Sequence, residues 1–145
     1  MDLFDALVKY ETDLWNHLDD RLRDAGAVPL PTLFALRVVR RHPGTCRVHE
    51  IRSDLGITVG AASKLVDRLE RDGLAVRRPH PDDRRSSLVS LTPAGDRAHD
   101  EGVEILRRGL DDQLGGEPGI ADLTAGLARL QARLAARDDA RGVLA

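Results

Sequence analysis

Residues 48–91 constrain the fold of this chain more than any other stretch. An apolar-faced segment over about 49–55 is followed by a glycine-containing turn and by a second helical pattern over 59–71. In the second pattern apolar residues recur at i, i+3, i+4 and i+7, which places them on one helix face; they are Ala62, Leu65, Val66 and Leu69. Thr58 is a good N-cap for this helix, and Gly73 stands where a helix commonly ends. Two short helices joined in this way are typical of a DNA-binding helix-turn-helix.

A β-hairpin is predicted directly after the two helices. Segments 74–77 and 88–91 are short apolar-rich runs, and Pro79 and Pro81 mark the loop that connects them. The hairpin tip, residues 82–85, reads Asp-Asp-Arg-Arg. Helix, turn, helix and hairpin in this order predict a winged helix.

Further helices are predicted on both sides of this core. Residues 3–25 carry one apolar stripe at spacings of three and four, and a shorter helix is expected over 32–41. Thr92-Pro93 is a cap followed by a proline in the first turn, so a helix is expected from there to about residue 114. In the last helix Leu123, Leu127, Leu130 and Leu134 have the 4-3-4 spacing of a helix-pairing seam.

The expected fold class is mainly α with a small β-hairpin wing, in one domain over residues 1–145. A winged helix-turn-helix lobe is predicted over 30–98, with dimerisation helices at 1–28 and 99–145. The apolar seams at both ends fit packing of the terminal helices within one subunit or an intertwined homodimer. We favour the homodimer, because a helix-turn-helix that reads a palindrome needs two copies.

Composition limits the class of protein. With 41% hydrophobic and 32% charged residues, the chain has the composition of a soluble globular protein. No apolar run approaches the length of a membrane span, and acids stand near the N-terminus where a signal peptide has bases, so we expect a cytoplasmic protein with no membrane partner. The net charge of −2 argues against nucleic-acid binding. Residues 64–85, however, hold seven basic and five acidic residues, so a basic face exists if the acids point elsewhere.

An ordered set of motifs over about residues 30–98 resembles the multiple antibiotic resistance regulator (MarR) family. The motifs are Asp54-Leu55-Gly56-Ile57-Thr58, Leu65-Val66-Asp67-Arg68-Leu69-Glu70, Asp72-Gly73-Leu74, Pro81-Asp82-Asp83-Arg84-Arg85-Ser86 and Val89-Ser90-Leu91-Thr92-Pro93-Ala94-Gly95. The resemblance implies a single MarR-type domain that acts as a homodimeric transcription factor on double-stranded DNA. It also implies a repressor of nearby genes that is released by a small phenolic or other ligand. The helix from Thr58 to Arg71 would enter the major groove of a pseudo-palindromic operator, and the wing at 83–85 would reach the minor groove.

The residues expected to contact DNA lie on the second helix and the wing. They are Thr58, Gly60, Ala61, Ser63, Lys64, Arg68, Arg78, Asp83, Arg84 and Arg85. Gly60-Ala61-Ala62 is a departure from the family's pattern, because it leaves few side chains at the start of the helix that can hydrogen-bond base edges. Direct readout would then fall on Thr58, Ser63, Lys64 and Arg68, with DNA shape supplying the rest. Asp83 is expected to orient an arginine, because a carboxylate repels phosphate.

The resemblance also implies an effector pocket between the first helix and the DNA-binding lobe. Its candidate lining residues are Tyr10, Trp15, His17 and Arg37. Tryptophan and tyrosine on one helix are conspicuous in a chain with only 3% aromatic residues. Packing in the core or in the dimer interface is the simpler role for any one of these residues.

Enzymatic and sensing alternatives have weaker support. The sequence shows no nucleophile elbow, phosphate-binding glycine loop or paired metal motif, so we expect no catalytic residue, no cofactor and no metal. Potential metal ligands do fall in one short span, at His42, Cys46, His49 and Glu50, but their spacing matches no compact zinc motif. A metal- or redox-responsive regulator of the same fold, and a winged-helix adaptor that binds proteins, remain the alternatives.

Overall fold

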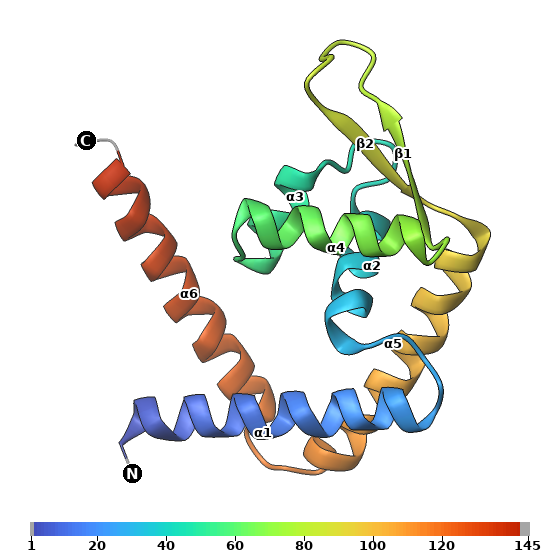
Figure 1. The fold of residues 1–145 in the computed structure, drawn as a ribbon. Coiled ribbons are helices and arrows are strands. Elements are labelled where there is room, and N and C mark those ends of the chain that lie inside the picture. Colours follow the sequence, from blue (N-terminus) through green and yellow to red (C-terminus); the bar gives the residue numbers. More distant parts are fainter. Residues whose placement is uncertain (1, 143–145) are drawn as a thin grey trace. The chain divides into compact units, whose positions relative to one another are not determined.

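The structure is a computed structural model that describes residues 2–142, and within them the chain forms six helices and one two-stranded hairpin (Figure 1). In chain order the elements are α1 (Leu3–Asp24), α2 (Leu30–Arg41), α3 (Val48–Leu55), α4 (Val59–Arg71), β1 (Ala75–Pro79), β2 (Ser87–Leu91), α5 (Pro93–Leu114) and α6 (Ile120–Gly142). The chain divides into two compact units, one up to Gly109 and one from Leu110 onward. The predicted fold class, mainly α with a winged helix-turn-helix, is confirmed.

Local capping explains where several helices begin and end. Thr58 caps α4 as predicted, because its hydroxyl accepts a hydrogen bond from the Ala61 N–H at 3.2 Å. The turn between α3 and α4 passes through Gly56 at φ +63°, and α4 is followed by Gly73 at φ +70°, a backbone conformation that glycine adopts without strain.

Helix α2 begins at Leu30, two residues earlier than the predicted start at Thr32. Pro31 is tolerated in the first turn, where backbone N–H groups have no partner within the helix. The Asp19 carboxylate of α1 accepts a hydrogen bond from the Leu30 N–H at 2.7 Å, so a neighbouring helix supplies the cap. This contact lies eleven residues away along the chain and has no local sequence signature.

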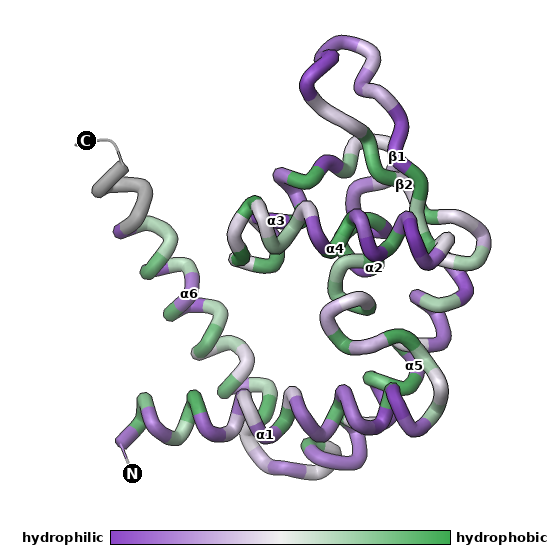
Figure 2. Tube along the Cα trace, viewed as in Figure 1, coloured by the Kyte–Doolittle hydropathy of each residue, from purple (hydrophilic) through white to green (hydrophobic). Residues whose placement is uncertain are grey.

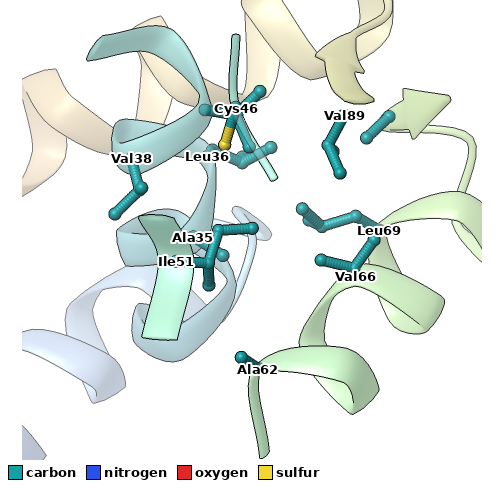
Figure 3. Close-up of a cluster of buried hydrophobic side chains, with 11 residues drawn as sticks. Ala35, Leu36, Val38, Cys46, Ile51, Ala62, Val66, Leu69 and Val89 are labelled. Carbon is teal, nitrogen blue, oxygen red and sulfur yellow. The ribbon is translucent and has the colours of Figure 1, made fainter. Parts of the chain in front are cut away.

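The core of the first unit lies where α2, α3, α4 and the hairpin meet. Its buried residues are Ala35, Leu36, Val38, Val39, Cys46, Ile51, Ala62, Val66, Leu69, Ala75 and Val89. Figure 3 shows Val66 and Leu69 extending from α4 toward Val89 of β2. The predicted core face of α4 is therefore confirmed, with Leu65 partly buried against the same cluster. Burial of this face fixes which side of α4 remains exposed.

The hairpin is antiparallel and pairs Ala75 with Leu91 at its base and Pro79 with Ser87 at its outer end. Both strands extend further toward the tip than predicted, and Pro79 is the last residue of β1 instead of a loop residue. A proline is tolerated there because the end of an edge strand does not need its N–H for pairing. The Val89 N–H also donates to the Cys46 carbonyl at 2.8 Å, which ties β2 to the segment before α3. In Figure 2 the loop beyond the strands is mostly hydrophilic.

Helix α5 approaches its neighbours closely at glycines spaced seven residues apart. A Cβ placed on Gly95 would lie 1.9 Å from the Leu74 carbonyl oxygen. A Cβ on Gly102 would lie 2.7 Å from Leu33 Cδ1, and one on Gly109 would lie 2.8 Å from Leu18 Cδ2. A side chain at Gly95 would collide with backbone, whereas one at Gly102 or Gly109 would require a leucine side chain to move.

Several large apolar side chains of the terminal helices are exposed in the single chain. On α1 they include Leu3, Phe4, Leu7 and Val8, and on α6 they are Leu123, Leu127, Leu130 and Leu134. None of the helices in the described range combines the length and the hydropathy needed to cross a bilayer. The predicted division into a 30–98 lobe and flanking dimerisation helices stays a prediction.

Candidate nucleic-acid interface

The face of α4 opposite the core carries the residues predicted to meet DNA. Thr58, Gly60, Ala61, Lys64 and Arg68 are exposed, and Ser63 is partly buried. Among the described residues, neither the Lys64 ammonium nor the Arg68 guanidinium has a hydrogen-bonding or ion-pairing partner. Their charges are therefore available to an anionic ligand.

Both acids of α4 are paired with one arginine of the wing. Arg77 of β1 donates from Nη2 to Asp67 Oδ1 at 2.7 Å, and its Nη1 lies 3.3 Å from Glu70 Oε2. The Arg77 backbone N–H also donates to Glu70 Oε1 at 3.1 Å. The sequence left open whether the five acids of residues 64–85 weaken a basic face. Two of these acids, Asp67 and Glu70, are paired with Arg77. This pairing also fixes the wing to α4.

The wing tip is shaped by backbone contacts. The His80 N–H donates to the Ser86 carbonyl at 3.1 Å, and the Ser86 N–H donates to the Asp83 carbonyl at 3.0 Å. The Asp83 carboxylate accepts from the backbone N–H of Arg85 at 3.0 Å. Asp83 was expected to orient an arginine side chain, but in this structure it orients the backbone that carries Arg85. Arg78, Arg84 and Arg85 are exposed, and no described residue pairs with their guanidinium groups.

A groove of about 410 Å³ separates the start of α3 from α4 and the wing. Its lining residues are Arg47, Val48, His49, Ser63, Asp67, Arg77, Arg85, Ser86 and Ser87. Arg47 Nη2 lies 2.8 Å from His80 Nε2, and the Asp82 backbone nitrogen lies 3.1 Å from His80 Nδ1. The sequence analysis did not propose Arg47, His80 or Ser86 as site residues. Arg47 immediately precedes the first helix of the helix-turn-helix, and that position is the signal that could have identified it.

A second cavity, of about 420 Å³, lies between α1, α2 and the helix-turn-helix. Its lining residues are Trp15, Pro31, Phe34, Arg37, Arg41, Asp54, Leu55, Ile57 and Leu65. Trp15 stacks on Phe34 with ring centroids 5.5 Å apart, and the Arg37 guanidinium lies 5.3 Å from the Phe34 ring centroid. Of the predicted effector residues, Trp15 and Arg37 line this cavity, whereas Tyr10 and His17 are not among its lining residues. Phe34 was missed, although its position three residues before Arg37 places both on one face of a helix.

The four potential metal ligands have separate environments. Cys46 is fully buried, and burial, reinforced by the charges of Glu50 and Asp54, raises the pKa of its thiol to about 12. His42 Nε2 lies 3.0 Å from Asp54 Oδ2, and the Glu50 carboxylate accepts from the Arg47 N–H at 2.8 Å. His49 is exposed. Over residues 2–142 no three His, Cys, Asp or Glu side chains gather in a geometry that could hold a metal ion.

Comparisons with known proteins identify the family to which this chain belongs. The family described as MarR family matches residues 28–86. The multiple antibiotic resistance protein MarR of Salmonella typhimurium is 32% identical over 99 residues, which cover 65% of this chain and 69% of that protein.

Solved structures show the same fold. The transcriptional regulator BldR from Sulfolobus solfataricus superposes with a TM-score of 0.82 and 24% identity, over 90% of this chain and 93% of that one. BpsR of Bordetella bronchiseptica, whose DNA binding is regulated by 6-hydroxynicotinic acid, superposes with a TM-score of 0.76 and 21% identity, over 90% and 98% of the two chains.

Proposed function

Since the chain belongs to the MarR family of DNA-binding transcriptional regulators, we propose that it is a homodimeric repressor that binds a pseudo-palindromic operator and is released by a small ligand. The observation that carries the proposal is the distribution of charge around α4. Lys64 and Arg68 are exposed and unpaired among the described residues, while Asp67 and Glu70 beside them are both paired with Arg77. A chain with a net charge of −2 thus presents a locally basic surface at its helix-turn-helix.

The exposed face of α4 is the part of the protein that enters the major groove. Lys64 and Arg68 are long cations one helical turn apart, and both can reach phosphates or the acceptor edge of guanine. Gly60 and Ala61 give the start of α4 a smooth surface that allows close approach of the backbone to DNA. Few base edges are contacted there, so DNA shape contributes to specificity.

The wing extends this surface to the minor groove. Arg84 and Arg85 are exposed at the end of the hairpin, and Asp83 holds the backbone of Arg85 in a turn. An arginine at a narrow minor groove gains from the enhanced negative potential of A·T-rich sequence. Arg78 lies on the outer part of β1 and adds a phosphate contact.

The homodimer is supported by the apolar residues that the single chain leaves exposed. Leu123, Leu127, Leu130 and Leu134 repeat along α6 at the spacing of a helix-pairing seam, and each is at least 38% exposed. A second copy would bury this seam and the apolar residues of α1. A two-fold axis also gives two recognition helices, whose half-sites would lie ~10 bp apart on one face of the DNA.

The cavity at Trp15 is the proposed effector site, and its chemistry suits a planar aromatic acid. The stacked rings of Trp15 and Phe34 offer a flat apolar wall, and Arg37 places a cation beside it. The 6-hydroxynicotinic acid that regulates BpsR is a ligand of this class. The cavity is also lined by Leu55 and Ile57, at the end of α3 and the turn before α4. A ligand there would act directly on the elements that position α4.

Binding to fragments of the protein's own genome tests the proposal. We expect selection of a two-fold symmetric sequence, with an affinity that falls steeply between 50 and 200 mM salt. The single tryptophan, Trp15, makes intrinsic fluorescence a reporter of the cavity, so aromatic acids should quench it and reduce operator binding at the same concentrations. Arg37→Ala should weaken this quenching and leave operator affinity unchanged. A protein that selects no DNA, or that binds all DNA equally at every salt concentration, would refute the repressor and favour a protein-binding adaptor.

A further inference from the structure

We propose that Arg47 binds a DNA backbone phosphate in the groove between α3, α4 and the wing, and that His80 is the residue that positions it. The inference rests on the proposed function and extends it to a third segment of the protein. Neither the recognition helix nor the wing tip contains Arg47, which immediately precedes α3.

The lining of the groove fits a phosphate group. Arg47 and Arg85 contribute guanidinium groups, and Ser63, Ser86 and Ser87 contribute hydroxyl donors. Asp67 is the one carboxylate among the lining residues, and Arg77 binds it at 2.7 Å. A phosphate oxygen accepts hydrogen bonds from guanidinium and hydroxyl groups alike, and a guanidinium can bind two such oxygens at once. The groove thus combines an excess of positive charge with several hydrogen-bond donors.

The way in which Arg47 is held distinguishes it from Arg77. Two carboxylates neutralise Arg77, which therefore acts as a structural link between α4 and β1. Arg47 is bound through Nη2 to the imidazole of His80 at 2.8 Å. Arginine cannot accept a hydrogen bond, so this contact is a hydrogen bond in the tautomer whose Nε2 is the accepting nitrogen. A neutral partner fixes the direction of the guanidinium without cancelling its charge.

The remaining donors of Arg47 can bind phosphate. A guanidinium has five N–H groups, and the contact with His80 uses one of them. Glu50, on the same helix, has one carboxylate oxygen bonded to the Arg47 backbone N–H at 2.8 Å. This bond caps α3 and places Arg47 at the end of the groove.

His80 connects this arginine to the wing. Its backbone N–H donates to the Ser86 carbonyl at 3.1 Å, so the ring is carried by the part of the hairpin that also presents Arg85. Arg47 and Arg85 therefore line the same groove, and His80 links Arg47 to the wing. A phosphate between them would be bound by both.

Salt-dependent binding of Arg47→Gln to operator and random duplexes tests the phosphate contact. We expect both affinities to fall by the same factor, because a phosphate contact carries no sequence information. Each lost phosphate contact makes the negative slope of log K against log salt less steep by ~0.9. A dimer loses two contacts, so the slope of the variant should be less steep by ~1.8. Between 50 and 200 mM salt the affinity of the wild type should then fall ~12-fold more than that of the variant.

Arg23→Gln is the matched control for the loss of one positive charge. Arg23 lies on α1, where it pairs with Asp19 and Asp20, and it is not among the groove residues. Its slope should equal that of the wild type. An unchanged slope for Arg47→Gln, with wild-type operator binding intact, would overturn the inference and leave the proposed function standing. Absence of wild-type DNA binding would instead overturn the proposed function.

Variants of His80 separate a positioning role from a general structural one. His80→Ala removes the acceptor and should lower affinity in the same direction as Arg47→Gln, whereas His80→Gln keeps an acceptor and should restore binding. In an Arg47→Gln background, His80→Ala should cause no further loss, because its effect acts through Arg47. Additive losses in the double variant, or full affinity of His80→Ala, would overturn the positioning role. Circular dichroism melting of each variant establishes that the fold is retained.

Discussion

Gly95→Ala tests the close approach of α5 to the Leu74 backbone. The added Cβ would lie 1.9 Å from the Leu74 carbonyl oxygen and 2.9 Å from its carbonyl carbon. The same oxygen accepts from the Thr92 N–H at 3.0 Å, and the Thr92 hydroxyl donates to the Gly73 carbonyl at 2.6 Å. No rotation of a side chain can relieve this clash, because the obstructing atom belongs to the backbone.

The size of the effect follows from this geometry. Cβ atoms essentially never approach another heavy atom below 3.0 Å, so the two segments must separate by at least 3.0 − 1.9 = 1.1 Å. Overpacking of this kind costs about 3 kcal/mol. Alanine is favoured over glycine within a helix by about 1 kcal/mol, which partly offsets the cost. The net loss in the free energy of unfolding should be about 2 kcal/mol, and the melting temperature should fall by roughly 7 °C.

Thermal unfolding followed by circular dichroism, at one fixed protein concentration, measures this loss. Gly60→Ala is the control, because a Cβ there has no neighbour within 4 Å, and its melting temperature should stay at or slightly above that of the wild type. Gly102→Ala and Gly109→Ala should show smaller losses than Gly95→Ala, since the obstructing atoms are the ends of leucine side chains that can move. A Gly95→Ala protein that melts within 1 °C of the wild type, as a rough threshold, would refute the close approach of α5 to the Leu74 turn.

Other predictions concern DNA contact, dimerisation and the cysteine. Arg68→Ala should cost ~1–3 kcal/mol on the operator and little on random DNA if Arg68 contacts a base, and equal losses on both in a gel-shift titration would assign it to phosphate. Replacing Leu127 and Leu130 together by glutamate should place unpaired charge in the α6 seam, and sedimentation equilibrium should then find monomers, whereas a wild type that is already monomeric contradicts the homodimer. Because the Cys46 pKa is raised to about 12, its thiolate fraction at pH 8 is ~0.0001, so native protein should resist iodoacetamide at that pH. As pH rises from 9 toward 12 the unfolded chain loses this proton first, so stability should fall in that range, and rapid native alkylation at pH 8 would show that the thiol is accessible.

Features that depend on neighbouring residues in the chain could be predicted from sequence. Thr58 caps α4 because its hydroxyl reaches an N–H three residues ahead, and the core face of α4 follows from helical periodicity. The start of α2 could not be placed in this way, because its cap comes from Asp19 on another helix. A sequence pattern within one helix cannot predict a contact with another helix.

In the candidate site, too, local features could be predicted from the sequence and contacts between distant residues could not. Lys64, Arg68 and Arg85 could be proposed because a helix face and a hairpin tip are local features. The pairing of Asp67 with Arg77 joins residues ten positions apart on different elements, so a count of charges could not assign it. For the cavity, Trp15 and Arg37 were predicted, but their meeting depends on Phe34 and on the packing of α1 against α2.

The His80 ring can accept only one of two hydrogen bonds that are offered to it. Two N–H groups point at it, Arg47 Nη2–H toward Nε2 and the Asp82 backbone N–H toward Nδ1. A neutral imidazole has one accepting nitrogen, and a protonated imidazole has none. One tautomer therefore holds Arg47 and the other holds the loop at Asp82, with one hydrogen bond gained for each one given up. Transfer of the ring proton from one nitrogen to the other would exchange the Arg47 contact for the Asp82 contact, and the ¹⁵N chemical shifts of the two ring nitrogens would report which tautomer the protein holds.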